Sequence, residues 1–148
     1  MELDLKAIFN GEVKSIDLNY TFNMLDENFD GVYPLKQPVE VKGFIKNSAD
    51  VVKLVCDIKA IVTKPCDRCC EEVSKPYNIK INSVLVLSND NENEEYIPVP
   101  SYKLDLYELV RSEIVLNLPL LHLCSEDCLG VCFICGQNLN KDKCNCIK

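Results

Sequence analysis

The chain has 148 residues, of which 47% are hydrophobic and 26% are charged, as expected for one globular domain with a small appendage. No stretch approaches the ~20 consecutive apolar residues of a membrane helix. The first ten residues lack the basic start and apolar run of a signal peptide. We therefore expect a cytoplasmic protein without a membrane partner. The net charge of −7 argues against simple electrostatic binding of nucleic acid by the whole surface.

Charge is unevenly distributed along the chain. Residues 36–80 carry six acids and nine bases, whereas residues 1–35 and 81–118 each carry seven acids and two bases. The ordinary interpretation of the central basic band is a solvated sheet face. The alternative is an anion-binding surface, and its candidate RNA-binding residues are Lys53, Lys59, Lys64 and Arg68.

Alternating apolar and polar residues predict an antiparallel sheet in the first part of the chain. Strands are expected over residues 13–22, from Val39 through Ile45, over 52–62 and over about 73–87, with a turn at 47–50. The expected core faces are Val39, Val41 and Ile45; Val52, Leu54, Cys56, Ile58, Ala60 and Val62; and Tyr77, Ile79, Ile81, Leu85 and Leu87. Each strand should bury one face and expose the other to water.

One helix is predicted after a short extended edge at residues 96–100. Asp105 is a good N-cap, and Glu108 three residues later completes a capping-box-like pair. Apolar residues then recur at helical spacing, and Pro119 ends the pattern. The fold class expected is α+β, with a mainly antiparallel sheet, one packed helix and a Cys-rich C-terminal zinc tail. The two expected units are residues 1–118 and 119–148.

Eight of the ten cysteines form four short-spaced pairs. They are Cys66 and Cys69, Cys124 and Cys128, Cys132 and Cys135, and Cys144 and Cys146. Closely spaced thiolate pairs are typical of four-cysteine zinc sites, and we expect zinc as the cofactor. The alternative is a set of disulfides, which would require an oxidising compartment.

Proximity in sequence favours one site formed by Cys132, Cys135, Cys144 and Cys146. The other site would then combine Cys66 and Cys69 with Cys124 and Cys128, and it would attach the tail to the sheet. The alternative is a single zinc held by any four of the six tail cysteines, and sequence alone leaves this open. Cys56 is interpreted as core, and Cys70 has no assigned role. His122, the only histidine, is interpreted as a packed or surface residue rather than a ligand or base.

A dithiol enzyme is a further alternative. A redox C-x2-C motif begins a helix within a βαβ unit, whereas the motif at Cys66 and Cys69 lies between two predicted strands. The sequence also shows no carboxylate pair, phosphate loop or nucleophile–base set. We therefore expect no catalytic residues and no small-molecule substrate.

Several of these motifs resemble the bacterial and plastid YceD family, which is named for accumulation of large-subunit ribosomal RNA. The resemblance rests on the segments 65–69, 105–119, 123–132, 135–140 and 144–146. It implies a non-enzymatic factor in large ribosomal subunit biogenesis, with ribosomal RNA or a large-subunit ribosomal protein as the partner. The alternative from another class is a protein–protein adaptor without RNA contact.

Overall fold

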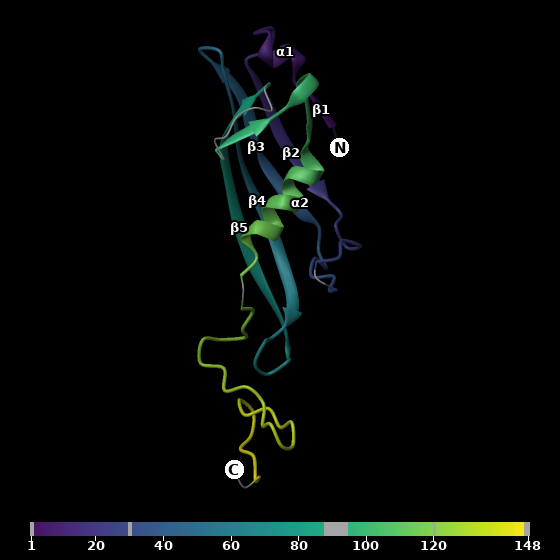
Figure 1. Cartoon of the computed structure of the whole chain (residues 1–148), viewed down its shortest axis with the longest axis vertical. Helices are drawn as coiled ribbons and strands as arrows, with labels where there is room; N and C mark the ends of the chain where they lie inside the picture. The colour runs from purple at the N-terminus through teal and green to yellow at the C-terminus, as the bar shows by residue number, and fades with distance from the viewer. Residues whose placement is uncertain (1, 30, 88–94, 120, 147–148) are drawn as a thin grey trace.

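The computed structural model describes residues 2–29, 31–87, 95–119 and 121–146. Its main feature is a long five-stranded sheet in the order β2-β3-β4-β5-β6, shown in Figure 1. The strands are β2 (Ser15–Phe22), β3 (Val39–Ser48), β4 (Val51–Pro65), β5 (Glu72–Val86) and β6 (Tyr96–Pro98). β2 to β5 pair antiparallel, and β6 joins the edge of the sheet parallel to β5. The expected α+β class and mainly antiparallel sheet are therefore confirmed.

The period-two pattern correctly predicts the core face of the sheet. All residues expected to be buried in β3 and β4 have at most 2% of their surface exposed. In β5, Ile79, Ile81 and Leu85 are buried and Tyr77 is half-buried. The prediction for Leu87 is wrong: it follows the last residue of β5 and is 43% exposed, because it is beyond the strand that would direct it into the core.

A second, two-stranded sheet was not anticipated from the sequence. β1 (Glu2–Asp4) pairs antiparallel with β7 (Lys103–Asp105), which follows the 3-10 helix η1 (Pro100–Tyr102). The four-residue helix α1 (Lys6–Phe9) comes between β1 and β2. Leu5 and Ile8 from this region are fully buried in the main core, although these elements are too short for periodicity to reveal them.

Helix α2 (Leu106–Asn117) lies across one side of the main sheet (Figure 1). The Asp105 side chain caps it by accepting a 3.2 Å hydrogen bond from the backbone N–H of Glu108, as the sequence predicts. The helix ends before Pro119, also as predicted. Its residues in the core are Leu106, Val110 and Ile114.

The loop after β2 fixes the exposed side of α2. The Glu27 carboxylate accepts a 2.5 Å hydrogen bond from the Tyr107 hydroxyl and a 2.6 Å hydrogen bond from Arg111 Nε. The hydrogen bond from Tyr107, followed by that from Arg111, lowers the pKa of Glu27 below its ordinary value. Charge-assisted bonds of this kind therefore hold the helix in register with the loop, and so fix where the chain leaves toward the tail.

Gly43 in β3 marks a close approach of two strands. It pairs with Cys56 of β4, and an added Cβ would lie 2.1 Å from the Val55 carbonyl oxygen and 2.4 Å from the Cys56 Cα. Both contacts are with backbone, so only a shift of the strands could relieve them. A glycine inside a strand often has this purpose.

We expect Gly43→Ala to lower the free energy of unfolding by about 1–3 kcal/mol or more, because overpacking forces the backbone to move. Urea denaturation followed by circular dichroism would measure it. Lys42→Ala is the matched control, since its side chain points away from the core, and it should change stability much less. Equal stability of the two variants would contradict the close approach.

The C-terminal segment begins where the helix ends and lies beyond one end of the sheet. Figure 1 shows it beside the turn between β4 and β5, whereas α1 lies at the opposite end of the molecule. None of the described helices has the length and apolar character needed to cross a membrane.

Candidate metal centres

The turn between β4 and β5 presents two cysteines toward the C-terminal segment. The backbone N–H of Cys66 donates to the Glu71 carbonyl at 2.7 Å, and that of Cys70 donates to the Cys66 carbonyl at 2.9 Å. Cys70 has a φ of +63°, a conformation that favours glycine. This tight turn buries Cys66 and Cys69 to 1% and 5% exposure and leaves Cys70 on the surface.

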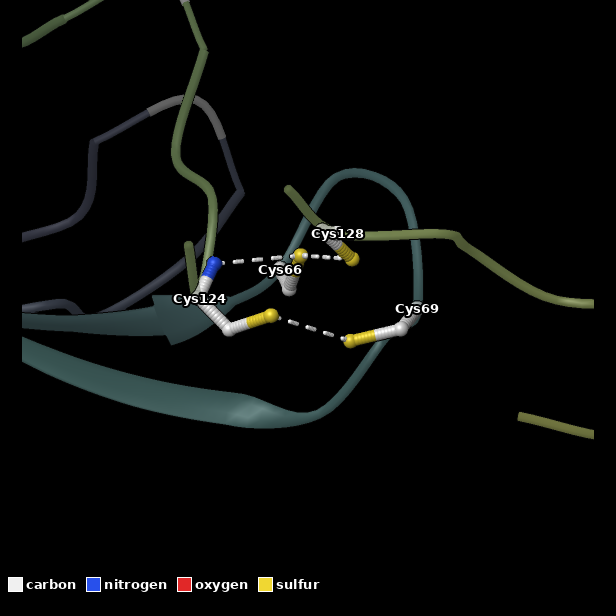
Figure 2. Close-up of side chains that lie close together, drawn as sticks. All are labelled: Cys66, Cys69, Cys124 and Cys128. Atoms are coloured by element: carbon white, nitrogen blue, oxygen red, sulfur yellow. Dashed lines mark hydrogen bonds between the residues drawn. The ribbon is translucent and has the colours of Figure 1, made fainter. Parts of the chain in front are cut away.

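These two thiols meet two more from the beginning of the tail. The Sγ atoms of Cys66 and Cys128 are 3.7 Å apart, and those of Cys69 and Cys124 are also 3.7 Å apart (Figure 2). All four sulfur atoms lie within 4.8 Å of one another. A zinc ion with Zn–S distances of about 2.3 Å separates its tetrahedral ligands by about 3.8 Å, so this arrangement fits a four-thiolate zinc site.

Hydrogen bonds to sulfur favour the thiolate form that a metal requires. Cys66 Sγ accepts from the backbone N–H of Cys124 at 3.3 Å, and Cys128 Sγ accepts from the Asn140 side-chain amide at 3.3 Å. Backbone N–H groups, first that of Cys69, lower the pKa of Cys66 to about 6. The Asn140 amide likewise lowers the pKa of Cys128. The site therefore contains donors that stabilise negative charge on these two sulfur atoms, whereas the neighbouring thiol of Cys128 raises the pKa of Cys124.

His122 fastens the start of the tail to the same turn. Its backbone N–H donates to Asp67 Oδ2 at 2.7 Å, and its carbonyl accepts from the Asp67 N–H at 2.8 Å. The residue is 1% exposed, and its ring Nε2 lies 2.9 Å from the Val73 carbonyl oxygen. The structure thus places His122 as a packed residue outside both cysteine clusters. Sequence reasoning missed its pairing with Asp67, because 55 residues separate the two.

A second cluster forms within the tail itself. Cys144 Sγ lies 3.3 Å from Cys132 Sγ and 3.5 Å from Cys135 Sγ, and with Cys146 all four sulfur atoms lie within 4.8 Å of one another. The turn after the second cysteine of the C-x2-C motif is closed by Gly136, which has a φ of +74°. This set of thiols also fits a four-thiolate site.

The second cluster is favoured by local backbone donors. Cys132 Sγ accepts from the Ile134 N–H at 3.4 Å, and Cys144 Sγ accepts from the Cys146 N–H at 3.1 Å. Backbone hydrogen bonds, that of Cys135 first, lower the pKa of Cys132 to about 6. This cluster is more exposed than the first, because only Cys132 is buried, whereas three of the four cysteines in the first cluster are buried.

The two clusters are joined by contacts of the loop between Cys135 and Cys144. Asn140 bonds Cys128 Sγ of the first cluster and also accepts from the Leu129 N–H at 2.9 Å. Lys141 forms an ion pair with Glu71 beside the β4–β5 turn. The loop of the second cluster therefore supports the first, a link that the spacing of the cysteines does not reveal. We call the set Cys66, Cys69, Cys124 and Cys128 the proximal cluster and the set Cys132, Cys135, Cys144 and Cys146 the distal cluster.

The structure brings together the same two sets of four cysteines that the spacing favours. It does not gather the candidate RNA-binding residues into one patch. Lys53 and Lys59 lie on the same exposed face of β4 but roughly 20 Å apart, at about 3.3 Å per residue. Lys64 lies with Arg111 in a hollow on the helix side, and Arg68 donates to the Cys128 carbonyl at 3.2 Å. Arg68 therefore serves the tail's own structure.

The fold and the two thiol clusters define an α+β protein with a cysteine-cluster tail that could hold two metal ions. The model of the family described as "Large ribosomal RNA subunit accumulation protein YceD" matches residues 54–148, so the chain belongs to the YceD family. The match covers most of β4, all of β5 and β6, α2 and both clusters, and it begins after β2 and β3. The resemblance noted in the sequence is therefore confirmed.

A curated relative carries the same family name. It is the "Large ribosomal RNA subunit accumulation protein YCED homolog 1, chloroplastic" of Arabidopsis thaliana, 24% identical over 147 aligned residues. The match covers 77% of this chain and 45% of the relative, so the chain spans about half the length of the relative it matches. No solved structure matches the chain.

Proposed function

We propose that this chain is a non-enzymatic, zinc-binding factor in large ribosomal subunit biogenesis. It would support accumulation of large-subunit ribosomal RNA by binding that RNA or a large-subunit ribosomal protein, in the cytoplasm. The observation that best supports this proposal is the pair of four-thiol clusters in a chain of the YceD family. The family name supports the process, and the sulfur geometry supports the metal.

The clusters suit a structural role better than a catalytic one. Each offers four sulfur ligands, and four protein ligands fill a tetrahedral ion, whereas catalytic zinc keeps one position open for water or substrate. Bound zinc would supply the free energy that orders a tail too short to fold alone. We propose accordingly that residues 1–118 form a metal-independent unit and that residues 119–148 form a metal-dependent one.

A protein adaptor is the second candidate, and the surface of the tail favours it. Phe133 and Ile134, within the C-x2-C motif of the distal cluster, are 103% and 65% exposed. Leu129, which precedes this motif, is 67% exposed. Large apolar side chains this exposed often mark protein contacts. In this alternative the metal clusters hold a hydrophobic turn against a ribosomal protein, without RNA contact.

Depletion of the protein in the cells that encode it tests the proposed function. We expect the ratio of large-subunit to small-subunit ribosomal RNA to fall, and the tagged wild-type protein to restore it. Tagged protein should also sediment with precursor large subunits in a density gradient. A normal RNA ratio after complete depletion would contradict the proposal.

The tagged protein also separates the two candidates. Binding to ribosomal RNA that weakens steeply with added salt favours the RNA-binding form, because phosphate contacts release counterions. Capture of a ribosomal protein without salt-dependent RNA binding, and its loss in Phe133→Ser, favour the adaptor. A thiol enzyme, the least favoured alternative, would have a cysteine that reacts rapidly with iodoacetamide in the metal-loaded protein.

A further inference from the structure

The sheet has a hollow on the side that faces away from α2. It has a volume of about 480 Å³ and lies over the ends of β3, β4 and β5 that are remote from the cysteine clusters. Among the residues that the structure describes, no carboxylate lines it. Its lining residues are Phe44, Lys46, Ser48, Val51, Lys53, Val55 and Asn82. This lining combines basic, aromatic and amide side chains, whereas the rest of the same face carries both acidic and basic side chains.

Two lysines in this hollow face each other across the strands. Lys46 of β3 pairs directly with Lys53 of β4 in the sheet register. Like charges directly opposite on one face destabilise a sheet. Among the described residues, the ion pairs include neither lysine. None of these ion pairs therefore neutralises the two lysines, and a bound anion would reduce the repulsion between them.

Apolar side chains lie beside these lysines. Phe44 is 39% exposed and pairs with Val55, while Val51 is 41% exposed. A second aromatic residue, Tyr96 of β6, lines an adjoining hollow that shares Lys53 and Asn82 with the first. Phe44 and Tyr96 thus lie on either side of Lys53 along a path across the sheet, and Lys46 lies beside Phe44 on β3.

We propose that this face, which we call the Phe44–Lys53 surface, binds single-stranded RNA, and this inference rests on the proposed function. Aromatic side chains offer stacking platforms for unpaired bases, and lysines neutralise the phosphates between them. A duplex hides its base faces, so Phe44 would have nothing to stack on. The Asn82 amide can bond a base edge.

Acidic residues limit the extent of the site. Asp17 of β2 lies opposite Phe44 in register, and Glu95 lines the adjoining hollow near β6. The RNA path therefore makes phosphate contacts mainly through two lysines. For a single strand this corresponds to a slope of about −1.4 in log affinity against log salt.

The test uses the full-length, zinc-loaded chain and a fluorescein-labelled twelve-nucleotide RNA, measured by anisotropy at several salt concentrations. We expect wild type to bind the single strand more tightly than a duplex of the same length. Lys46→Gln plus Lys53→Gln should flatten the salt slope. The same double variant should unfold at equal or higher urea concentration, because it removes the repulsion. If the two lysines had a purely structural role, their replacement would not reduce the salt dependence of RNA binding while leaving stability to urea equal or higher.

Phe44→Thr tests the stacking contact separately. Threonine keeps a high strand propensity but lacks a ring, so affinity should fall roughly tenfold while the fold persists. Lys6→Gln plus Lys36→Gln is the control with the same change of charge, since both residues are exposed and lie off this face. It should leave the salt slope near that of wild type.

Equal binding by wild type and both surface variants would overturn the proposal, as would an equal loss in the control. If the wild-type chain binds only a ribosomal protein, the surface assignment also fails. Sedimentation with precursor large subunits, measured in parallel, distinguishes these results from failure of the proposed function. Surface variants that still sediment normally would refute the RNA path alone.

Discussion

Replacement of Cys66 and Cys69 by serine should remove one equivalent of zinc per chain and release the tail from the sheet. These residues supply two of the four sulfur atoms of the proximal cluster. Two ligands cannot retain a structural zinc ion, and binding free energies for such ions are about 10–16 kcal/mol. The sheet and α2 should persist, because their core contains neither cysteine.

The measurements are zinc stoichiometry by elemental analysis and hydrogen exchange resolved along the chain. Protection should fall over residues 121–130 and remain over β3 and β4. Cys70→Ser is the matched control, since Cys70 is exposed in the same turn and belongs to neither cluster. It should keep both metal equivalents. A 66/69 variant that keeps all its zinc and an unchanged tail would show that the cluster is not a shared metal site.

Replacement of Cys132 and Cys135 should instead unfold the distal part of the tail and leave the proximal site loaded. The distal segment has little core of its own: Phe133 and Ile134 are exposed, and Cys135 lies on the surface. Without metal, a segment as short as residues 131–146 cannot stay folded, because chains below about 40 residues usually need a metal or disulfides. We expect loss of one zinc equivalent and of exchange protection over 131–146.

Contacts between the two clusters should weaken the proximal site when the distal part of the tail unfolds. Asn140 bonds Cys128 Sγ, and Lys141 pairs with Glu71, so unfolding of the distal loop removes both contacts. The proximal zinc should remain bound but become easier to extract, which a timed competition with a colorimetric chelator would measure. Asn140→Ala should speed proximal extraction alone. If the 132/135 variant loses both metals at once, the clusters form one cooperative unit rather than two sites.

Elements with local sequence signals could be predicted without the structure. Period-two alternation placed β2 to β5, because a strand that buries one face repeats every second residue. Asp105 and Pro119 placed both ends of α2, because capping and helix termination act within a turn of the chain. The four thiol pairs were recognisable from spacing alone, since ligands two to four residues apart can reach one ion.

Contacts between segments that are distant in sequence became apparent only from the folded chain. Cys66 and Cys128 are 62 residues apart, and only the turn between β4 and β5 brings them to 3.7 Å. Sequence reasoning favoured this set of four but could not exclude a single cluster of tail cysteines. The Asp67–His122 pairing and the close approach at Gly43 likewise depend on contacts between segments remote in sequence. Leu87 shows the same limit, because its exposure follows from where β5 ends rather than from its hydrophobicity.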